Sequence, residues 1–374
     1  MQLEFFPSRT LALYLARLFA TRILGVLVML VLVLQLLDLL GESGKILAAP
    51  GNGEPQLWSY VLLRLPQLVS RFLPYSVLLA TLLTFWPLNQ NSEVIAMRAA
   101  GLSAHQILAP LLVTALLVAA VAFGFNERVV TRASATLKAW QAVDYGPLPQ
   151  GEALRGNVYV GDGPDILAAD NVSGEGAAMQ LSGVTWYLRD PQGFITSETH
   201  GTSARFVVTG RNARGVTGGW QLTAPTRFDT STLATGPAPP GLVATGVTPA
   251  QIEISTVDAD AESFSRLARS IDTLRANGRR TAELDGKWWH KISGPLSALL
   301  MPLLGAVAAF GLARSGQLFI RAVIGMALGF AYFVIDNAAL AIGNFGGYPP
   351  LIAAWGPFLL FLLVGETVLI RTEE

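Results

Sequence analysis

Long apolar windows constrain this chain more than any other feature of its sequence. Each is long enough to cross the roughly 30 Å hydrocarbon layer of a membrane as a helix. Six windows are predicted as membrane spans: residues 23–40, 57–88, 107–125, 288–312, 320–341 and 352–370. Hydrophobic residues make up 52% of the chain and charged residues 14%, whereas a soluble domain carries about 25% charged residues. The composition therefore excludes an ordinary soluble enzyme and a disordered chain.

Basic residues are distributed unequally over the short segments between these windows. The side that would hold both termini carries Arg9, Arg17, Arg22, Arg98, Arg314, Arg321 and Arg371. The opposite short segments contribute only Lys45. Because short cytoplasmic loops are enriched in Lys and Arg, we expect the termini and the loop at 89–101 to be cytoplasmic. The large insert after the third span then lies on the far side.

The insert has a different pattern, with short runs of β-branched and aromatic residues between Gly, Pro, Asn and Asp. Predicted strands cover residues 157–160, 180–188, 194–198, 204–209, 220–224 and 251–256, and the Asp-Pro-Gln-Gly sequence at 190–193 predicts a turn. Many short strands with frequent turns favour an antiparallel sandwich or jellyroll. A helical repeat follows at 261–276. The predicted organisation is spans at 1–140, a β domain at 141–258, a helical linker at 259–287 and spans at 288–374.

Several kinds of chemistry lack the residues they require. The chain has no cysteine, which excludes disulfides and thiolate catalysis, and its three histidines (His105, His200 and His290) are scattered and interpreted as incidental. The only Gly-Lys pair, Gly44-Lys45, does not match a phosphate-binding P-loop. Lys+Arg and Asp+Glu are both 26, so net charge does not favour nucleic-acid binding. We expect a non-enzymatic chain without a metal or cofactor of its own, driven by a partner or an ion gradient.

The segment at 91–103 is the most informative cytoplasmic stretch. It is polar at its start and then helix-prone, with Asn91 or Ser92 as a predicted cap, Glu93 near the positive helix end and Gly101 as a stop. A short amphipathic helix between two spans is an element that an ATPase subunit can bind on the cytoplasmic side. An ordinary interfacial helix is the alternative.

Three stretches give the chain a specific resemblance. They are Leu62-Leu63-Arg64-Leu65-Pro66-Gln67-Leu68, the pair Leu73-Pro74, and the 91–103 segment just described. In this order and topology they resemble the lipopolysaccharide-export permease family, which comprises LptF and LptG. Residues 36–45 and 348–357 are more similar to the LptG branch. The resemblance covers essentially the whole chain and implies six transmembrane helices, three on either side of an inserted periplasmic antiparallel β-jellyroll.

The resemblance also implies a set of partners. Family members are inner-membrane permease subunits of an ABC transporter that takes lipopolysaccharide from the outer leaflet of the inner membrane. An LptF-type permease completes the heterodimer, an LptB-type ATPase dimer binds ATP and Mg, and LptC and LptA receive the lipid. In this chain the coupling helix would be about 91–100, and its ATPase contacts would be Ser92, Glu93, Met97 and Arg98.

Basic residues near the outer ends of the second and third spans form a candidate substrate site. Arg64 and Arg71 share a helix face with Gln67, and Arg128 and Arg132 are spaced i, i+4. Arginine suits phosphate because its planar fork makes paired charge-assisted hydrogen bonds. We therefore predict a cationic rim for the phosphates of lipopolysaccharide, made of Lys45, Arg64, Arg71, Arg128 and Arg132.

The chain departs from the family beside this rim. The family uses basic residues in and beside the first span, where this sequence has Asp38 and Glu42 with only Lys45 nearby. A one-to-one transfer of the family's basic cluster therefore does not hold. The alternative is that Arg64 and Arg71 pair with these acids or extend to lipid headgroups.

Four functions are alternatives to an LptG-type permease subunit. They are the paralogous LptF-type subunit, a permease for another lipid or a lipoprotein, a scaffold without transport, and a membrane-embedded enzyme. Lipoprotein-release and macrolide permeases usually carry their large extracytoplasmic domain after the first span, whereas in this chain the large insert follows the third predicted span. An enzyme needs convergent catalytic groups, but Asp38, Asp336 and Glu366 are scattered in the sequence. For Asp336 an interfacial cap is favoured and a buried proton relay is the alternative, and Glu366 is interpreted as an anchor with Arg371.

Overall fold

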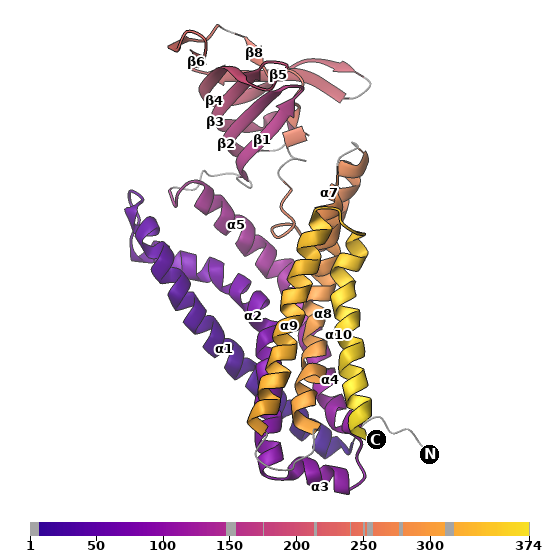
Figure 1. Cartoon of the computed structure of the whole chain (residues 1–374). Helices are drawn as coiled ribbons and strands as arrows, with labels where there is room; N and C mark the ends of the chain where they lie inside the picture. The colour runs from indigo at the N-terminus through magenta and orange to yellow at the C-terminus, as the bar shows by residue number, and fades with distance from the viewer. Residues whose placement is uncertain are drawn as a thin grey trace. The chain divides into compact units, whose positions relative to one another are not determined.

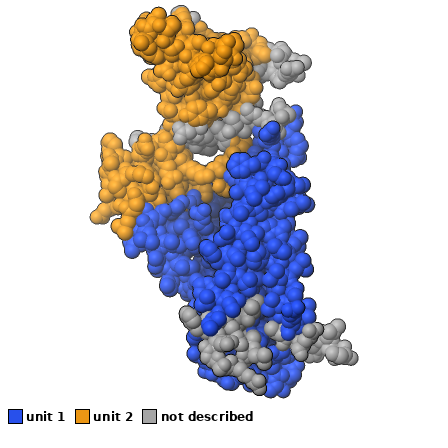
Figure 2. Space-filling view, in the orientation of Figure 1, with its two compact units in different colours: residues 1–39, 64–131, 263–374 blue, residues 40–63, 132–262 orange. Residues whose placement is uncertain are grey.

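The chain folds into two compact units (Figure 2). The computed structural model describes residues 7–146, 155–174, 176–212, 215–239, 241–249, 251–252, 257–276, 280–310 and 318–373. The first unit, here the helical unit, comprises Met1–Leu39, Arg64–Thr131 and Ser263–Glu374. The second, here the sheet unit, comprises Leu40–Leu63 and Arg132–Glu262. The chain therefore passes between the units four times.

Helices dominate the chain on both sides of the β insert (Figure 1). Before the insert they are α1 (Arg9–Ala48), α2 (Glu54–Gln90), α3 (Glu93–Ala99), α4 (Ala104–Phe125), the π-helical turn η1 (Asn126–Val130) and α5 (Thr131–Ala142). After it they are α7 (Phe264–Ala276), α8 (Ala282–Phe310), α9 (Leu318–Asn344) and α10 (Pro350–Glu373). The helical repeat predicted at 261–276 corresponds to α7.

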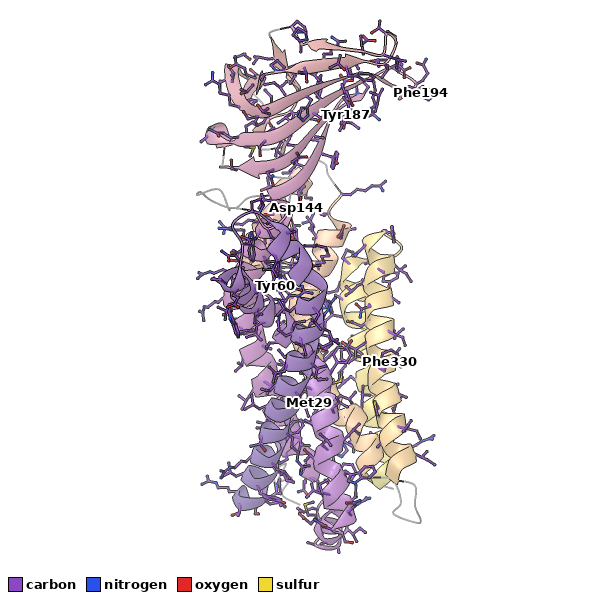
Figure 3. The ribbon with its side chains drawn as sticks, turned by 90° about the vertical axis from the view of Figure 1, so that its left-hand side faces the viewer. Met29, Tyr60, Asp144, Tyr187, Phe194 and Phe330 are labelled. Carbon is purple, nitrogen blue, oxygen red and sulfur yellow. The ribbon has the colours of Figure 1, made fainter. Side chains whose placement is uncertain are left out.

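Five helices among the described residues are long and apolar enough to cross a membrane. They are Arg9–Ala48, Glu54–Gln90, Ala104–Ala142, Ala322–Asn344 and Pro350–Arg371. Five of the six predicted spans are thus confirmed as membrane-capable helices. The fourth, at 288–312, overlaps α8, which is not among the five, and its last residues lie outside the described part of the chain. Large apolar side chains such as Met29 and Phe330 are 64% and 63% exposed and point outward from the helical unit (Figure 3), as lipid-facing residues do.

The helical unit is closely packed at two glycines, Gly305 and Gly329, where neighbouring helices leave no room for a side chain. A Cβ atom added to Gly305 of α8 would lie 2.6 Å from Thr81 Cγ2 of α2, and one added to Gly329 of α9 would lie 2.2 Å from Leu78 Cδ2. Both distances are shorter than a van der Waals contact. Small residues at these positions let the helices approach each other, which is how membrane helices gain packing energy.

The sheet unit contains one antiparallel sheet. Its strands are β1 (Arg155–Asp162), β2 (Asp165–Ser173), β3 (Gln180–Arg189), β4 (Ile195–Asn212), β5 (Gly215–Thr223), β6 (Thr226–Asp229), β7 (Ala234–Pro237) and β8 (Leu242–Val243). The hydrogen-bonded order is β1-β2-β3-β4-β5-β8, with β6 paired to β4 and β7 paired to β6. The antiparallel β insert is therefore confirmed, with most strands beside their neighbours in sequence.

The strand predictions need three corrections. The strands predicted at 194–198 and 204–209 are parts of the single 18-residue strand β4, because the residues between them keep pairing with β3. Strands β2, β6, β7 and β8 were not predicted. Gln251 and Ile252 are helical rather than extended, and residues 253–256 of that predicted strand lie outside the described residues. The turn at 190–193 is confirmed, since Asp190 Oδ1 accepts hydrogen bonds from the amides of Gln192 and Phe194.

One tryptophan occupies the centre of the sheet core. Trp220 of β5 has no exposed surface, and its ring meets Phe206 of β4 edge-on, with 5.3 Å between ring centroids. Its indole N–H donates a 2.8 Å hydrogen bond to the carbonyl oxygen of Val247. The ring thus fills the core while its polar atom remains bonded, as a buried tryptophan requires.

Candidate functional site

The predicted coupling segment is a short helix, α3, with a well-formed end. The amides of Gly101 and Leu102 bond to the carbonyl oxygens of Arg98 and Met97, and Gly101 has φ +89°. These two bonds make a Schellman motif, which needs a left-handed residue and therefore favours glycine. Gly101 is confirmed as the stop. Ser92 stands at the N-cap position but makes no side-chain cap bond, so the predicted serine cap is wrong because its backbone is itself left-handed, with φ 59°.

The two faces of α3 have different roles. Val94 and Met97 are buried in the core of the helical unit, with Met97 9% exposed. Ser92, Ile95 and Arg98 are exposed. Met97, which was predicted as an ATPase contact, lies on the inward face three residues after Val94. Its contact with an ATPase stays a prediction. The exposed face remains available to a partner.

Glu93 connects α3 to the first helix. The hydroxyl of Tyr14 in α1 donates a 3.4 Å hydrogen bond to Glu93 Oε2. The carboxylate also lies in the first turn of α3, where the helix dipole favours negative charge. Tyr14 and the dipole thus hold the Glu93 carboxylate at the start of the coupling segment.

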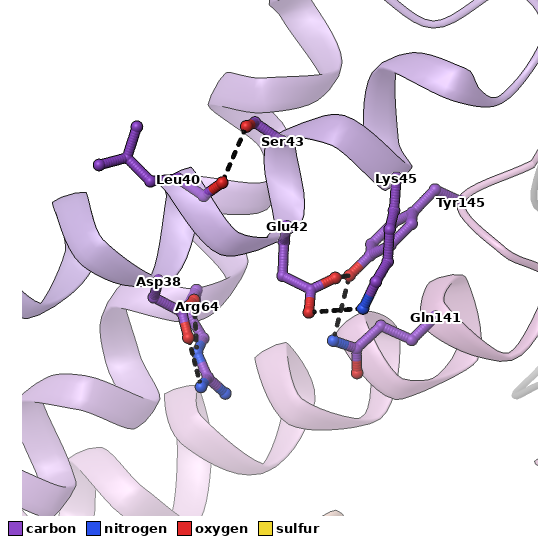
Figure 4. A network of polar contacts seen from close by, with 8 residues as sticks. All are labelled: Asp38, Leu40, Glu42, Ser43, Lys45, Arg64, Gln141 and Tyr145. Carbon is purple, nitrogen blue, oxygen red and sulfur yellow. Dashed lines mark hydrogen bonds and ion pairs between the residues drawn. The ribbon is translucent and has the colours of Figure 1, made fainter.

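Arg64 of α2 is paired with an acid of α1. Its Nη2 and Nε lie 2.8 and 3.1 Å from the two carboxylate oxygens of Asp38, and Nη1 donates to Gln67 Oε1 at 2.7 Å (Figure 4). Both members of the ion pair are about a quarter exposed. The sequence alternative, in which Arg64 pairs with Asp38, is therefore what the structure contains.

Lys45 is also neutralised by a neighbouring acid. Its Nζ lies 3.0 Å from Glu42 Oε1, and the Tyr145 hydroxyl donates to Glu42 Oε2 at 2.8 Å (Figure 4). Gln141 of α5 donates in turn to the Tyr145 oxygen at 3.3 Å, and Asn52 Nδ2 donates to the Tyr145 carbonyl at 2.8 Å. This network ties the end of α1 to the end of α5 inside the sheet unit.

The remaining rim residues, Arg71, Arg128 and Arg132, are exposed. Arg71, Arg128 and Arg132 have no ion pair within the part of the chain that the structure describes. Arg64, Arg71 and Arg128 belong to the helical unit, whereas Lys45 and Arg132 belong to the sheet unit. The five-residue rim therefore stays a prediction. Arg128 lies in the π-helical turn η1 and Arg132 in α5, so the predicted i, i+4 pair spans the junction of these two elements.

Contacts between η1, α7 and α8 form a joint that was not predicted from the sequence. Both carboxylate oxygens of Glu127 accept the amide N–H of Phe264, at 2.8 and 2.7 Å. The Phe264 ring stacks on Trp288, and the indole N–H of Trp288 donates to the Phe264 carbonyl oxygen at 3.1 Å. Glu127 lies in η1, and single π-helical turns occur frequently at functional sites. Trp288, the first residue of the predicted span at 288–312, was the sequence signal nearest to this joint.

Two histidines interpreted as incidental have acidic neighbours. His105 Nε2 lies 3.1 Å from Glu366 Oε2, so Glu366 contacts a histidine of α4. His290 Nε2 lies 3.8 Å from Asp336 Oδ2. Asp336 is 5% exposed, which corrects its interpretation as an interfacial cap. No group of three or more His, Cys, Asp or Glu that could hold a metal ion occurs within the described ranges.

Known proteins match this chain over nearly all of its length. A family model described as "Lipopolysaccharide export system permease LptF/LptG" matches residues 13–371. The lipopolysaccharide export system permease protein LptG of Escherichia coli (strain K12) is 26% identical over 375 residues, covering 98% of this chain and 99% of the relative. The protein of the same name from Haemophilus influenzae is 24% identical over 334 residues, covering 87% and 89%. A match across both helical regions and the intervening sheet shows that the chain belongs to the lipopolysaccharide export system permease LptF/LptG family.

Proposed function

We propose that this chain is the LptG-type transmembrane subunit of an ABC transporter that extracts lipopolysaccharide from the outer leaflet of the inner membrane. The family match across nearly the whole chain carries the proposal. A separate LptB-type ATPase dimer binds ATP and Mg and supplies the energy by hydrolysis, so this subunit needs no cofactor and performs no catalysis. An LptF-type permease is its partner in the membrane, and LptC and LptA receive the lipid on the periplasmic side.

The proposed topology follows from the same assignment. Helix α8 supplies a sixth span beside the five membrane-capable helices, both termini lie in the cytoplasm, and the antiparallel sheet is the periplasmic jellyroll-like domain. The loop charges support this orientation, because the arginines predicted to be cytoplasmic outnumber the single lysine of the opposite loops. The segment containing α3 then faces the ATPase.

Replacing Glu93 by alanine tests the proposed coupling helix. We expect the amount of ABC ATPase that co-purifies from native membranes to fall by about tenfold, because a few central side chains carry most of the binding energy of an interface. Glu283→Ala is the matched control, since it removes a carboxylate of α8 that pairs with Lys287 alone among the described ion pairs. Wild-type protein that purifies without an ATPase and a second permease would contradict the transporter assignment.

The Arg64–Asp38 pair provides a test of lipopolysaccharide binding. Arg64→Ala is expected to raise the lipopolysaccharide concentration that half-stimulates ATP hydrolysis by about tenfold, because a charge-assisted hydrogen bond contributes roughly 1.5–3 kcal/mol. Asp38→Asn is expected to act in the opposite direction, since it releases the guanidinium from its acid. Arg275→Ala is the control. Arg275 also donates hydrogen bonds to both carboxylate oxygens of an acid, Asp285, but it lies outside the rim. Unchanged stimulation and export in Arg64→Ala would remove Arg64 from the rim.

A further inference from the structure

A carboxyl group and an imidazole ring face each other between α8 and α9. Asp336 lies eight residues before the last residue of α9, and His290 lies eight residues after the first residue of α8. At about 1.5 Å per residue, each is roughly 12 Å from its helix end. The two side chains therefore lie at matching depth on antiparallel neighbours, and 3.8 Å separates Asp336 Oδ2 from His290 Nε2.

Asp336 lacks the hydrogen bonds that an ionised carboxylate needs. Its Oδ1 atom is buried and has no hydrogen-bond partner within the described residues. The 3.8 Å from Oδ2 to His290 is also longer than a hydrogen bond. An ionised carboxylate accepts at both oxygens, and burying it without donors is costly. The surroundings of Asp336 thus suit a carboxyl group that carries a proton.

The imidazole is held so that one nitrogen faces this carboxyl group. Its Nδ1 lies 3.3 Å from the hydroxyl of Ser293, which is fully buried. Gly294 leaves space beside the ring, because a Cβ atom there would lie 3.3 Å from His290 Nε2. Contacts on one nitrogen of a histidine determine the role of the other. Ser293 and Gly294 therefore leave Nε2 directed at Asp336.

We propose that His290 and Asp336 form a proton-binding site between α8 and α9. A hydronium ion transfers a proton to the Asp336 carboxylate, so that one O–H bond of the hydronium breaks, one O–H bond forms on the carboxyl group, and a water molecule leaves. Release of the proton to water is the reverse step and restores the carboxylate. Asp336 lies in the membrane-capable helix Ala322–Asn344, and an ionisable residue inside such a helix is a candidate for a functional site. The site goes beyond the proposed function and does not depend on which lipid the permease carries.

Other ionisable groups near the pair set its electrostatic surroundings. On α9 itself the neighbour is Tyr332, and on α2 Tyr75 interacts electrostatically with both Arg71 and Asp336. Helix α8 also carries Lys287, which pairs with Glu283, and Lys291. Helix α10 contributes Glu366, Arg371 and Glu373, all near its C-terminal end. Among the ion pairs of the described residues, Asp336 pairs with His290 alone.

Infrared difference spectroscopy tests the site directly. The full-length protein is purified with its partners into lipid nanodiscs and titrated between about pH 5 and about pH 9, the range in which histidine changes charge. We expect a carbonyl-stretch band of a protonated carboxyl group that appears as the pH falls. It should shift when aspartate is labelled with carbon-13 and be lost in Asp336→Asn. In His290→Gln its midpoint should move by about one pH unit or more.

The second histidine–carboxylate pair supplies the control. His105 and Glu366 are 32% and 41% exposed, so Glu366→Gln should leave the aspartate band unchanged. A wild-type spectrum without a band that responds to labelled aspartate overturns the proposal, and this measurement needs no variant to fold. A band that persists in Asp336→Asn assigns the proton to another aspartate. A midpoint that stays constant in His290→Gln removes the histidine from the site.

Discussion

Replacing Trp220 by alanine is expected to lower the free energy of unfolding of the sheet unit by about 4 kcal/mol. Truncating a buried Trp costs roughly 3–5 kcal/mol, because the lost burial adds to the cost of the cavity left behind. Trp220 is fully buried, and its loss also leaves the Val247 carbonyl oxygen without its indole donor. Hydrogen exchange followed by mass spectrometry should show faster exchange in peptides from β4 and β5.

An exposed aromatic residue of the same sheet provides the control for this experiment. Tyr159 of β1 is 67% exposed, and surface substitutions usually change stability by about 0.5 kcal/mol or less. Tyr159→Ala should therefore leave exchange in β4 and β5 near the wild-type rate. Equal acceleration by both variants would show that Trp220 has no special place in the core.

Replacing Gly305 by leucine is expected to destabilise the helical unit by about 1–3 kcal/mol. Extra side-chain volume in a packed core forces neighbours off their rotamers or moves the backbone. At Gly305 the first obstacle is Thr81, whose β-branched side chain is fully buried and donates a hydrogen bond to the Val77 carbonyl oxygen. Because Thr81 is stiff at χ1, α8 has to move away from α2. Thermal unfolding of the protein in nanodiscs measures the loss.

The matched substitution for Gly305 lies on α1. No atom lies within 4 Å of a Cβ atom added to Gly25, so Gly25→Leu introduces the same side chain without a clash. We expect an unfolding temperature close to that of the wild type. If the Gly305→Leu protein is as stable as the Gly25→Leu protein, α2 and α8 are not in close contact at Thr81 and Gly305.

Local sequence patterns predicted the elements well. Apolar windows locate α1, α2, α4, α9 and α10 because a span must satisfy its backbone hydrogen bonds internally and cover them with apolar side chains. The Gly101 stop was equally predictable, since the left-handed residue of a Schellman motif favours glycine. Strand β2 was missed because its central residues are buried in succession rather than in alternation, so the period-2 signal of a half-buried strand is weak.

Contacts between distant residues were the part that the sequence did not reveal. Glu127 and Phe264 are 137 positions apart, and no periodicity relates them. The inward direction of Met97 depends on where α3 docks, which its seven residues do not specify. The Arg64–Asp38 pair was foreseen only as one of two outcomes, because arginines in a span can pair with an acid or extend to headgroups. Charge alone does not choose between them.

The four passages of the chain between the two units have a consequence for biosynthesis. The core of the helical unit joins residues as far apart as Leu15 and Leu369, so it is incomplete until the last three helices have been synthesised. The sheet-unit segment Arg132–Glu262 comes first. At roughly 5–20 residues per second, the early helices wait on the order of ten seconds in the membrane before α8 emerges. The surfaces of the early helices that later pack against α8 and α9, such as the one around Leu78 and Thr81 of α2, are uncovered during this interval.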